Sequence, residues 1–362
     1  MKKKLIGIDM FRGLAIFAVV VLHVDGSIVV PPLGWAQVTS FAKFTVPFFL
    51  AASFYLAIDK LYSSLKPYPL RSRLTRLLIP YSCWSALYVF YKIVKYSMTG
   101  DSGKLVALFH DPLALICFGG AAFHLYFLPL LAIGTILIKF SEWTIAKKIS
   151  LAGLVLLCLV SFITYEILIV SGNSHDIVIH QAFQPLIAAV VPMENINPLL
   201  RWIAVSLACV IRCLPYILVS TILNHPAFKN FQLNFVNRRP NWWPWLWLFI
   251  FIILNGFGPH FLPQSLYEVS RGYLALWTAI SLSNILKDNY LIQSLGACSF
   301  GIYLSHIFVL EFFQSMMKRI DPDYINSTST PFLLMMAIVI MGISWAITLL
   351  LTRTKRLSSI LF

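Results

Sequence analysis

The stretch FRGLAIFAVVVLH, residues 11–23, places one arginine and one histidine in an otherwise apolar run. Eleven helical steps of about 100° bring residue 23 to within about 20° of residue 12. A continuous helix would therefore carry Arg12 and His23 on one face, about 16 Å apart along its axis. Ionisable groups are costly against lipid, so these two should face the interior of a helix bundle and mark a functional site. The alternative is a snorkelling arginine and a histidine hydrogen-bonded between helices.

The composition is that of a membrane protein. Of the 362 residues, 59% are hydrophobic and 12% are charged, and the mean hydropathy is +0.80, far from the balance of soluble globular chains. The net charge of +14 does not indicate nucleic-acid binding, because the basic residues lie between apolar segments and not on a soluble basic face. The six cysteines lack the spacings of a disulfide framework or a zinc site.

Ten segments satisfy the requirement of about 20 mostly apolar residues for a transmembrane helix. They cover residues 6–30, 36–59, 76–98, 122–140, 148–170, 197–223, 241–258, 265–286, 291–316 and 332–352. The first begins like a secretory signal, but no small-residue cleavage site follows, so we interpret it as a span. Segments 104–118 and 177–192 are too short or too broken for a span and are expected to be re-entrant or interfacial.

The basic residues predict the orientation of these helices. Lys and Arg concentrate in alternate loops, including residues 60–76 and 353–356, whereas the long loop at 171–198 has none. By the positive-inside rule, both termini are cytoplasmic. No internal repeat or appended soluble domain is visible. The sequence therefore predicts a single integral-membrane domain over residues 1–362, an all-α polytopic fold with about ten transmembrane helices.

Five motifs, taken in order, resemble those of the membrane acyltransferase-3 family. In the first, IDMFRGLAIFAVVVLH, Asp9, Arg12 and His23 are similar to the family's Asp, Arg-Gly and His at the same spacings. The others are KFTVPFFLAASFYLA at 43–57, RSRLTRLLIPY at 71–81, FHLYFLPLL at 123–131 and SFGIYLSH at 299–306. Two motifs depart from the family pattern, with Ala52 and Ser53 in place of Ser-Gly and Tyr126 in place of Trp.

The resemblance implies an enzyme that moves an acyl group, commonly acetyl, from cytoplasmic acyl-CoA to a hydroxyl of an envelope molecule. It implies acetyl-CoA as the acyl donor and a cell-surface saccharide, or its lipid-linked precursor, as the acceptor. It also implies a bacterial inner membrane as the location. The acceptor, the acyl chain length and the oligomeric state are not fixed by the sequence.

Three arginines are predicted to bind the phosphates of CoA. Arg73 and Arg76 are i,i+3 neighbours on one helical face at a predicted cytoplasmic end, where guanidinium groups suit phosphates. Arg12 lies on the same side of the membrane, with Asp9 three residues earlier to orient it. The positive-inside rule alone also explains cationic residues there. We apply that explanation to Arg71, whereas the family motif favours a functional role for Arg73 and Arg76.

His23 is the predicted catalytic base, because a hydroxyl acceptor must lose its proton and imidazole titrates near the working pH. Direct deprotonation and a covalent acyl-enzyme both stay open. Asp25 lies two residues further on and should face elsewhere if the helix continues. The predicted orienting partner is therefore Glu311, which lies at a similar depth in the ninth span.

Three further residues are predicted to contact substrate. His124 and Tyr126 lie near the outer end of the fourth span, and Lys43 opens the second family motif. An interhelical hydrogen bond is the alternative role for His124. His306, with Tyr303 on the same helical face, is expected to be structural.

Two rival functions are compatible with polar residues in an apolar chain. A transporter or flippase for a saccharide or anionic substrate would also place Arg and His in a cavity, although the related halves common in transporters are not visible. A membrane sensor or scaffold would tolerate substitution of the polar residues. No metal site is predicted, because no His, Cys or carboxylate pair has ligand-like helical spacing supported by a third group. The predicted partners are acyl-CoA, the acceptor and membrane lipid.

Overall fold

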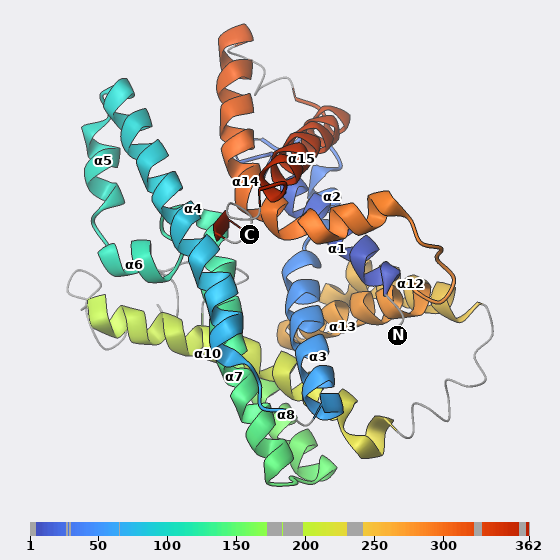
Figure 1. Cartoon of the computed structure of the whole chain (residues 1–362). Coiled ribbons are helices and arrows are strands. Elements are labelled where there is room, and N and C mark those ends of the chain that lie inside the picture. The colour runs from blue at the N-terminus through green and yellow to red at the C-terminus, as the bar shows by residue number, and fades with distance from the viewer. Residues whose placement is uncertain are drawn as a thin grey trace. The chain divides into compact units, whose positions relative to one another are not determined.

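The computed structural model describes residues 5–26, 28, 30–64, 66–171, 183, 198–229, 242–321, 328–354 and 360–361. Their elements are α1 (Ile6–Val21), α2 (Trp35–Ala42), α3 (Thr45–Ser64), α4 (Leu70–Thr99), α5 (Ser102–Leu108), α6 (Pro112–Cys117), η1 (Phe123–Tyr126), α7 (Phe127–Ala146), α8 (Leu151–Val170), α10 (Pro198–Asn224), α12 (Trp243–Phe257), η3 (Gly258–His260), α13 (Gln264–Leu282), α14 (Tyr290–Ile320) and α15 (Thr330–Thr352). Figure 1 shows these helices coloured along the chain. The prediction of an all-helical polytopic membrane protein is confirmed.

Each of the ten predicted spans contains a helix, and seven helical segments among the described residues are long and apolar enough to cross a membrane. The seven are α2 with α3, α4, η1 with α7, α8, α10, α14 and α15. Of the other three, α1 has 16 residues and α12 has 15, which is shorter than a span requires. Helix α13 has 19 residues but is not apolar enough to count among the seven. The cytoplasmic placement of both termini stays a prediction.

The two segments that the sequence predicted to be re-entrant or interfacial can be compared with the structure only in part. Segment 104–118 forms α5 and α6, which are too short to span a membrane, whereas segment 177–192 lies outside the described residues except for residue 183.

The assumption that one helix joins Arg12 to His23 is wrong. Helix α1 ends at Val21, and the backbone N–H of His23 donates to Val20 O at 3.0 Å, so the chain tightens into a turn before His23.

The chain divides into two compact units. The first unit comprises Met1–Phe49, Pro240–Leu262 and Ser270–Phe362, and the second comprises Leu50–Arg239 and Pro263–Val269. In the first unit, α14 packs against both α1 and α15. In the second unit, α10 packs against α7 and α8, and α5 and α6 fold back beside α4, as the cyan helices of Figure 1 show.

Close helix packing in the first unit depends on glycine. A Cβ atom on Gly296 of α14 would lie 2.6 Å from the Cβ and 2.7 Å from the Cα of Asp9 on α1. Helix–helix interfaces in membranes use small residues in this way to let backbones approach. Nearby, the backbone N–H of Gly7 donates to Ser283 Oγ at 2.9 Å. Because Asp9 contacts Gly296 and Val24 O accepts from Gln314 Nε2 at 3.4 Å, α1 and α14 run parallel.

Candidate active site

A basic groove lies where α4 begins and α7 approaches its end. It has a volume of about 750 Å³ and is lined by the positively charged side chains of Arg71, Arg76 and Lys139, together with Tyr68, Pro69, Leu70, Ser72 and Thr75. Lys139 Nζ also pairs with Glu142 Oε2 at 2.5 Å. Because α4 starts directly after Pro69, the arginines of its first two turns are held on a regular helix. The groove therefore offers clustered cations to an anionic ligand.

Arg73 is exposed on the first turn of α4 and is not among the residues that line the groove. It nevertheless lies close to the groove, because its charge affects the pKa of Tyr68, which lines the groove. Burial raises the pKa of the Tyr68 hydroxyl, and the nearby Arg73 guanidinium opposes that rise. Tyr68 is therefore a neutral hydrogen-bond donor beside the cations at physiological pH. Sequence reasoning assigned Arg71 to membrane topology, whereas the structure places it in the groove.

An aromatic cluster around His124 joins η1, which directly precedes α7, to the middle of α4. The ring of His124 is buried and makes edge contacts with Tyr88 at 5.3 Å and with Phe123 at 5.9 Å between ring centroids. Tyr88 follows Arg76 by twelve residues on α4, so the two positions are about 18 Å apart along the helix. Within the second unit, the basic groove and the histidine cluster are thus separated by about 18 Å of helix.

A tight loop before η1 holds His124 and Tyr126 in place. Gly119 adopts a φ of +79°, and a Cβ there would lie 2.4 Å from the backbone N of Tyr126. The Tyr81 hydroxyl accepts from the backbone N–H of Gly119 at 2.9 Å and donates to Ile116 O at 2.8 Å. Because one hydroxyl satisfies two backbone groups of the loop, α4 fixes the position of η1. Tyr81 is the last residue of the third family motif, but nothing in the sequence indicated this role, and Gly119 lies in none of the five motifs.

The substitution Gly119→Ala is expected to destabilise the protein and displace His124. A left-handed conformation alone costs an alanine about 1–2 kcal/mol, and the overlap with Tyr126 should add about 1–3 kcal/mol. Thermal unfolding of the purified protein in detergent measures the effect. Gly100→Ala is the matched control, since Gly100 has a φ of +69° but no atom within 4 Å of its added Cβ. Equal loss of stability in the two variants would contradict the close approach.

Tyr126 lies within electrostatic reach of a buried arginine that the sequence analysis did not single out. Arg212 of α10 is near Tyr126 and pairs with Glu268 of α13. Its Nη2 lies 3.4 Å from Glu268 Oε2, which also accepts from the Tyr165 hydroxyl at 2.7 Å. Gln264 Nε2 donates to the other carboxylate oxygen at 3.3 Å. The ion pair of Arg212 and Glu268 therefore lies within electrostatic range of Tyr126.

The remaining cationic candidates lie in the first unit. Arg12 is partly buried on α1, and its Nη1 lies 4.0 Å from Asp9 Oδ1. This pairing agrees with the expected i,i+3 relation and keeps the guanidinium beside a carboxylate. Lys43 follows the last residue of α2 and is exposed. The structure thus places Arg12 and Lys43 on separate elements of the first unit and does not bring them into one contact.

His23 lies in the turn after α1 and is partly buried. Its ring stacks on that of His306, with centroids 5.5 Å apart and ring planes 24° from parallel. Glu311 lies on α14 five residues beyond His306 and is partly buried. The carboxylate of Asp25 accepts from Trp35 Nε1 at 2.7 Å. His306 of α14, for which sequence reasoning expected a structural role, thus contacts the His23 ring.

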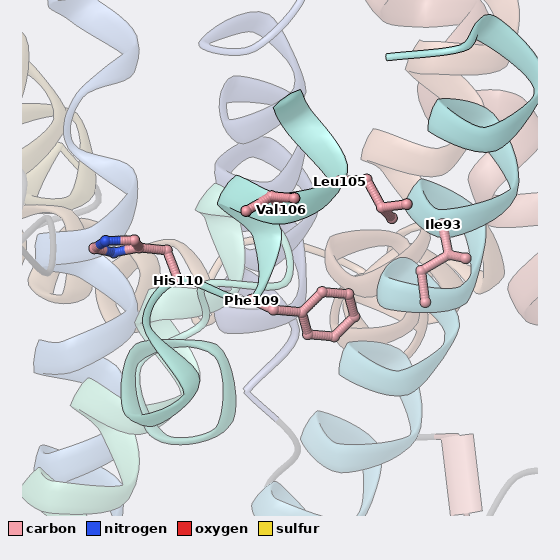
Figure 2. Close-up of a pocket in the computed structure, with 5 residues that line it drawn as sticks. All are labelled: Ile93, Leu105, Val106, Phe109 and His110. Carbon is pink, nitrogen blue, oxygen red and sulfur yellow. The ribbon is translucent and has the colours of Figure 1, made fainter. Parts of the chain in front are cut away.

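A second groove, of about 580 Å³, lies between α4 and the α5 segment and is almost wholly apolar. Figure 2 shows the side chains of Ile93, Leu105 and Phe109 gathered on one side, whereas His110 extends away from the Phe109 ring. Because no polar group points among these side chains, the groove suits an apolar ligand such as an acyl chain and offers no catalytic group.

Across the described part of the chain, no three His, Cys, Asp or Glu residues are grouped so that they could hold a metal ion.

Comparison with known families agrees with the motifs. A family model described as an acyltransferase domain matches residues 5–349, nearly the whole chain. The chain therefore belongs to the acyltransferase-3 family and is a membrane-bound acyltransferase. No curated protein and no solved structure gives a significant match to it.

Proposed function

We propose that the protein transfers an acetyl group from acetyl-CoA to a hydroxyl of a cell-surface saccharide or its lipid-linked precursor, in a bacterial inner membrane. The observation that carries the proposal is the basic groove at the start of α4. Its three cationic side chains, Arg71, Arg76 and Lys139, surround a space of about 750 Å³. An acyl donor that carries several phosphates matches this charge, whereas a neutral donor would leave the arginines unused.

The donor would bind through its phosphates. Arginine forks form paired hydrogen bonds to phosphate oxygens, and Lys139 adds a point charge. Arg73 stands beside the groove next to Tyr68 and is included in the donor site on the strength of the family motif. Arg12 is a further donor-binding residue in this proposal, with Asp9 as the carboxylate that holds it.

The dimensions of the second unit suit a long, thin donor. An extended pantetheine arm is comparable in length to the roughly 18 Å of helix between Arg76 and Tyr88. A donor anchored in the groove and extended along α4 and α7 would present its thioester toward His124. His124 and Tyr126 are the proposed substrate contacts there. Lys43 is a further proposed contact for the acceptor.

In the proposed reaction, the acceptor oxygen forms a bond to the thioester carbonyl carbon as the acceptor proton passes to His23. Collapse of the resulting oxyanion breaks the bond between carbon and sulfur, and the CoA thiolate leaves and takes up a proton. His23 gives its own proton back to solvent or to the leaving thiolate and so returns to its starting state. Glu311 is the proposed group that orients His23.

Binding of the donor tests the groove directly. The double variant Arg71→Ala, Arg76→Ala is expected to bind acetyl-CoA about 10- to 100-fold more weakly than wild type, since it loses charge-assisted hydrogen bonds. Calorimetry on protein in nanodiscs measures the affinity, and the parallel pair Arg73→Ala, Arg76→Ala tests the share of Arg73.

Lys147→Ala is the matched control for the binding measurement. Lys147 is an exposed basic residue at the end of α7 and does not line the groove, so its removal should leave the affinity unchanged. Unchanged affinity in both arginine pairs, in protein that unfolds at the wild-type temperature, would remove the groove as the donor site.

A further inference from the structure

The ring of His23 lies on a part of the chain that regular helix does not hold. Helix α1 ends two residues earlier, and the backbone N–H of His23 makes a short-range bond to Val20 O. The backbone at His23 is therefore not held by the i to i−4 hydrogen bonds of a helix. A base must lie within hydrogen-bond distance of the proton that it accepts, so other contacts must hold its ring in place.

Helix α14 contacts the turn at two points. Gln314 Nε2 donates to the backbone oxygen of Val24 at 3.4 Å, next to His23 in the chain. The imidazole of His306 stacks on the imidazole of His23 with centroids 5.5 Å apart, within the 4.5–7 Å at which aromatic rings attract each other. One contact therefore fixes the backbone beside His23 and the other meets its ring.

His306 is itself firmly placed. It is fully buried within a stretch of α14 in which every residue from Gly301 to Ile307 is buried. Its Nδ1 lies 2.7 Å from Tyr303 O and 3.2 Å from Ile302 O. Because a carbonyl oxygen only accepts, Nδ1 carries the hydrogen and donates it. The Tyr303 ring, with its centroid 6.1 Å away, supports the His306 ring from its own helix.

We propose that His306 is a positioning residue for His23, whose stacked ring holds the His23 imidazole in the orientation that acyl transfer requires. The inference rests on the proposed role of His23 as the base. It assigns to the fifth family motif a function in the reaction beyond helix packing. The contribution should fall on kcat, because the ring acts through His23 and touches neither the donor phosphates nor the basic groove.

Two variants separate the ring of His306 from its hydrogen bond. His306→Phe keeps an aromatic ring beside His23 and removes the donor to Tyr303 O. His306→Gln keeps a donor and removes the ring. We expect His306→Gln to lower kcat by about 10- to 100-fold and His306→Phe to stay within about threefold of wild type, with KM for acetyl-CoA unchanged in both.

Two control variants distinguish a positioning role of the His306 ring from a general loss of structure or activity. Ser305→Ala, a buried change on the same turn of α14 whose hydroxyl donates to Gly301 O, should retain wild-type kcat. In a His23→Ala background, His306→Gln should cause no further loss of activity. Equal activities of the Phe and Gln variants, whether high or low, would overturn the inference while leaving the base assignment intact. Full activity of His23→Ala alone would instead remove the proposed function of His23.

Discussion

His23→Ala is expected to lower kcat for acetyl transfer by about 10²- to 10⁴-fold, the contribution of a positioned general base. The variant should bind acetyl-CoA with wild-type affinity, because the donor phosphates are proposed to bind at the arginines and not at the imidazole. The measurement is a steady-state transfer assay on purified protein in nanodiscs, with calorimetry for the donor. Loss of kcat with donor binding retained assigns His23 to the chemical step.

A control for this prediction comes from another histidine. His260 is exposed in η3, and His260→Ala should transfer acetyl at the wild-type rate. The assignment of His23 fails if its alanine variant keeps near wild-type kcat, or if it loses donor binding to the same extent as activity. The second outcome would move His23 from the reacting centre to the donor site.

Arg212→Ala is expected to destabilise the protein by about 3–5 kcal/mol, because removal of one partner of a buried ion pair leaves the other charge without compensation. The side chains of Arg212 and Glu268 are 5% and 1% exposed, so water cannot replace the missing guanidinium. The Tyr165 and Gln264 donors keep part of the carboxylate satisfied. Thermal unfolding in detergent measures this loss of stability. It should be measured before kcat, because an unfolded variant would also lose activity.

Two comparisons test the cause of that instability. The double variant Arg212→Met, Glu268→Gln removes both charges and should recover much of the lost stability, since neutral residues of similar size often replace buried pairs without loss. Lys229→Ala breaks the pair with Asp59 at 2.8 Å, in which the side chains are 40% and 30% exposed. It should cost less than about 1 kcal/mol. A double variant as unstable as Arg212→Ala would contradict the ion-pair explanation.

The sequence predicted the helical architecture well because lipid imposes a strong constraint on length and composition. Backbone groups must be satisfied within each span, so apolar runs of about 20 residues mark helices reliably. All ten predicted segments contain a helix, and α14 and α15 include segments 291–316 and 332–352 in full. Hydropathy could not show where α1 stops, because Leu22, His23 and Val24 follow it without a proline or glycine.

The candidate site was predicted only in part, because its geometry depends on contacts between distant segments. Arg71 and Arg73 look alike in sequence, and only the folded structure shows that Arg71 lines the groove with Lys139 of α7 whereas Arg73 does not. Arg212 gave no signal because its partner, Glu268, is 56 residues away. His306 was visible within a motif, but its stacking on His23 arises from the packing of α14 against α1.

The parallel packing of α1 on α14 also bears on how the chain is made. The contact of Asp9 with Gly296 joins positions separated by nearly 290 residues, which a ribosome adds in roughly 15 to 60 s at about 5–20 residues per second. During that interval the first helix, with Arg12 on it, is in or near the membrane without its partner. The contact between α1 and α14 can therefore form only after almost the whole protein has been synthesised.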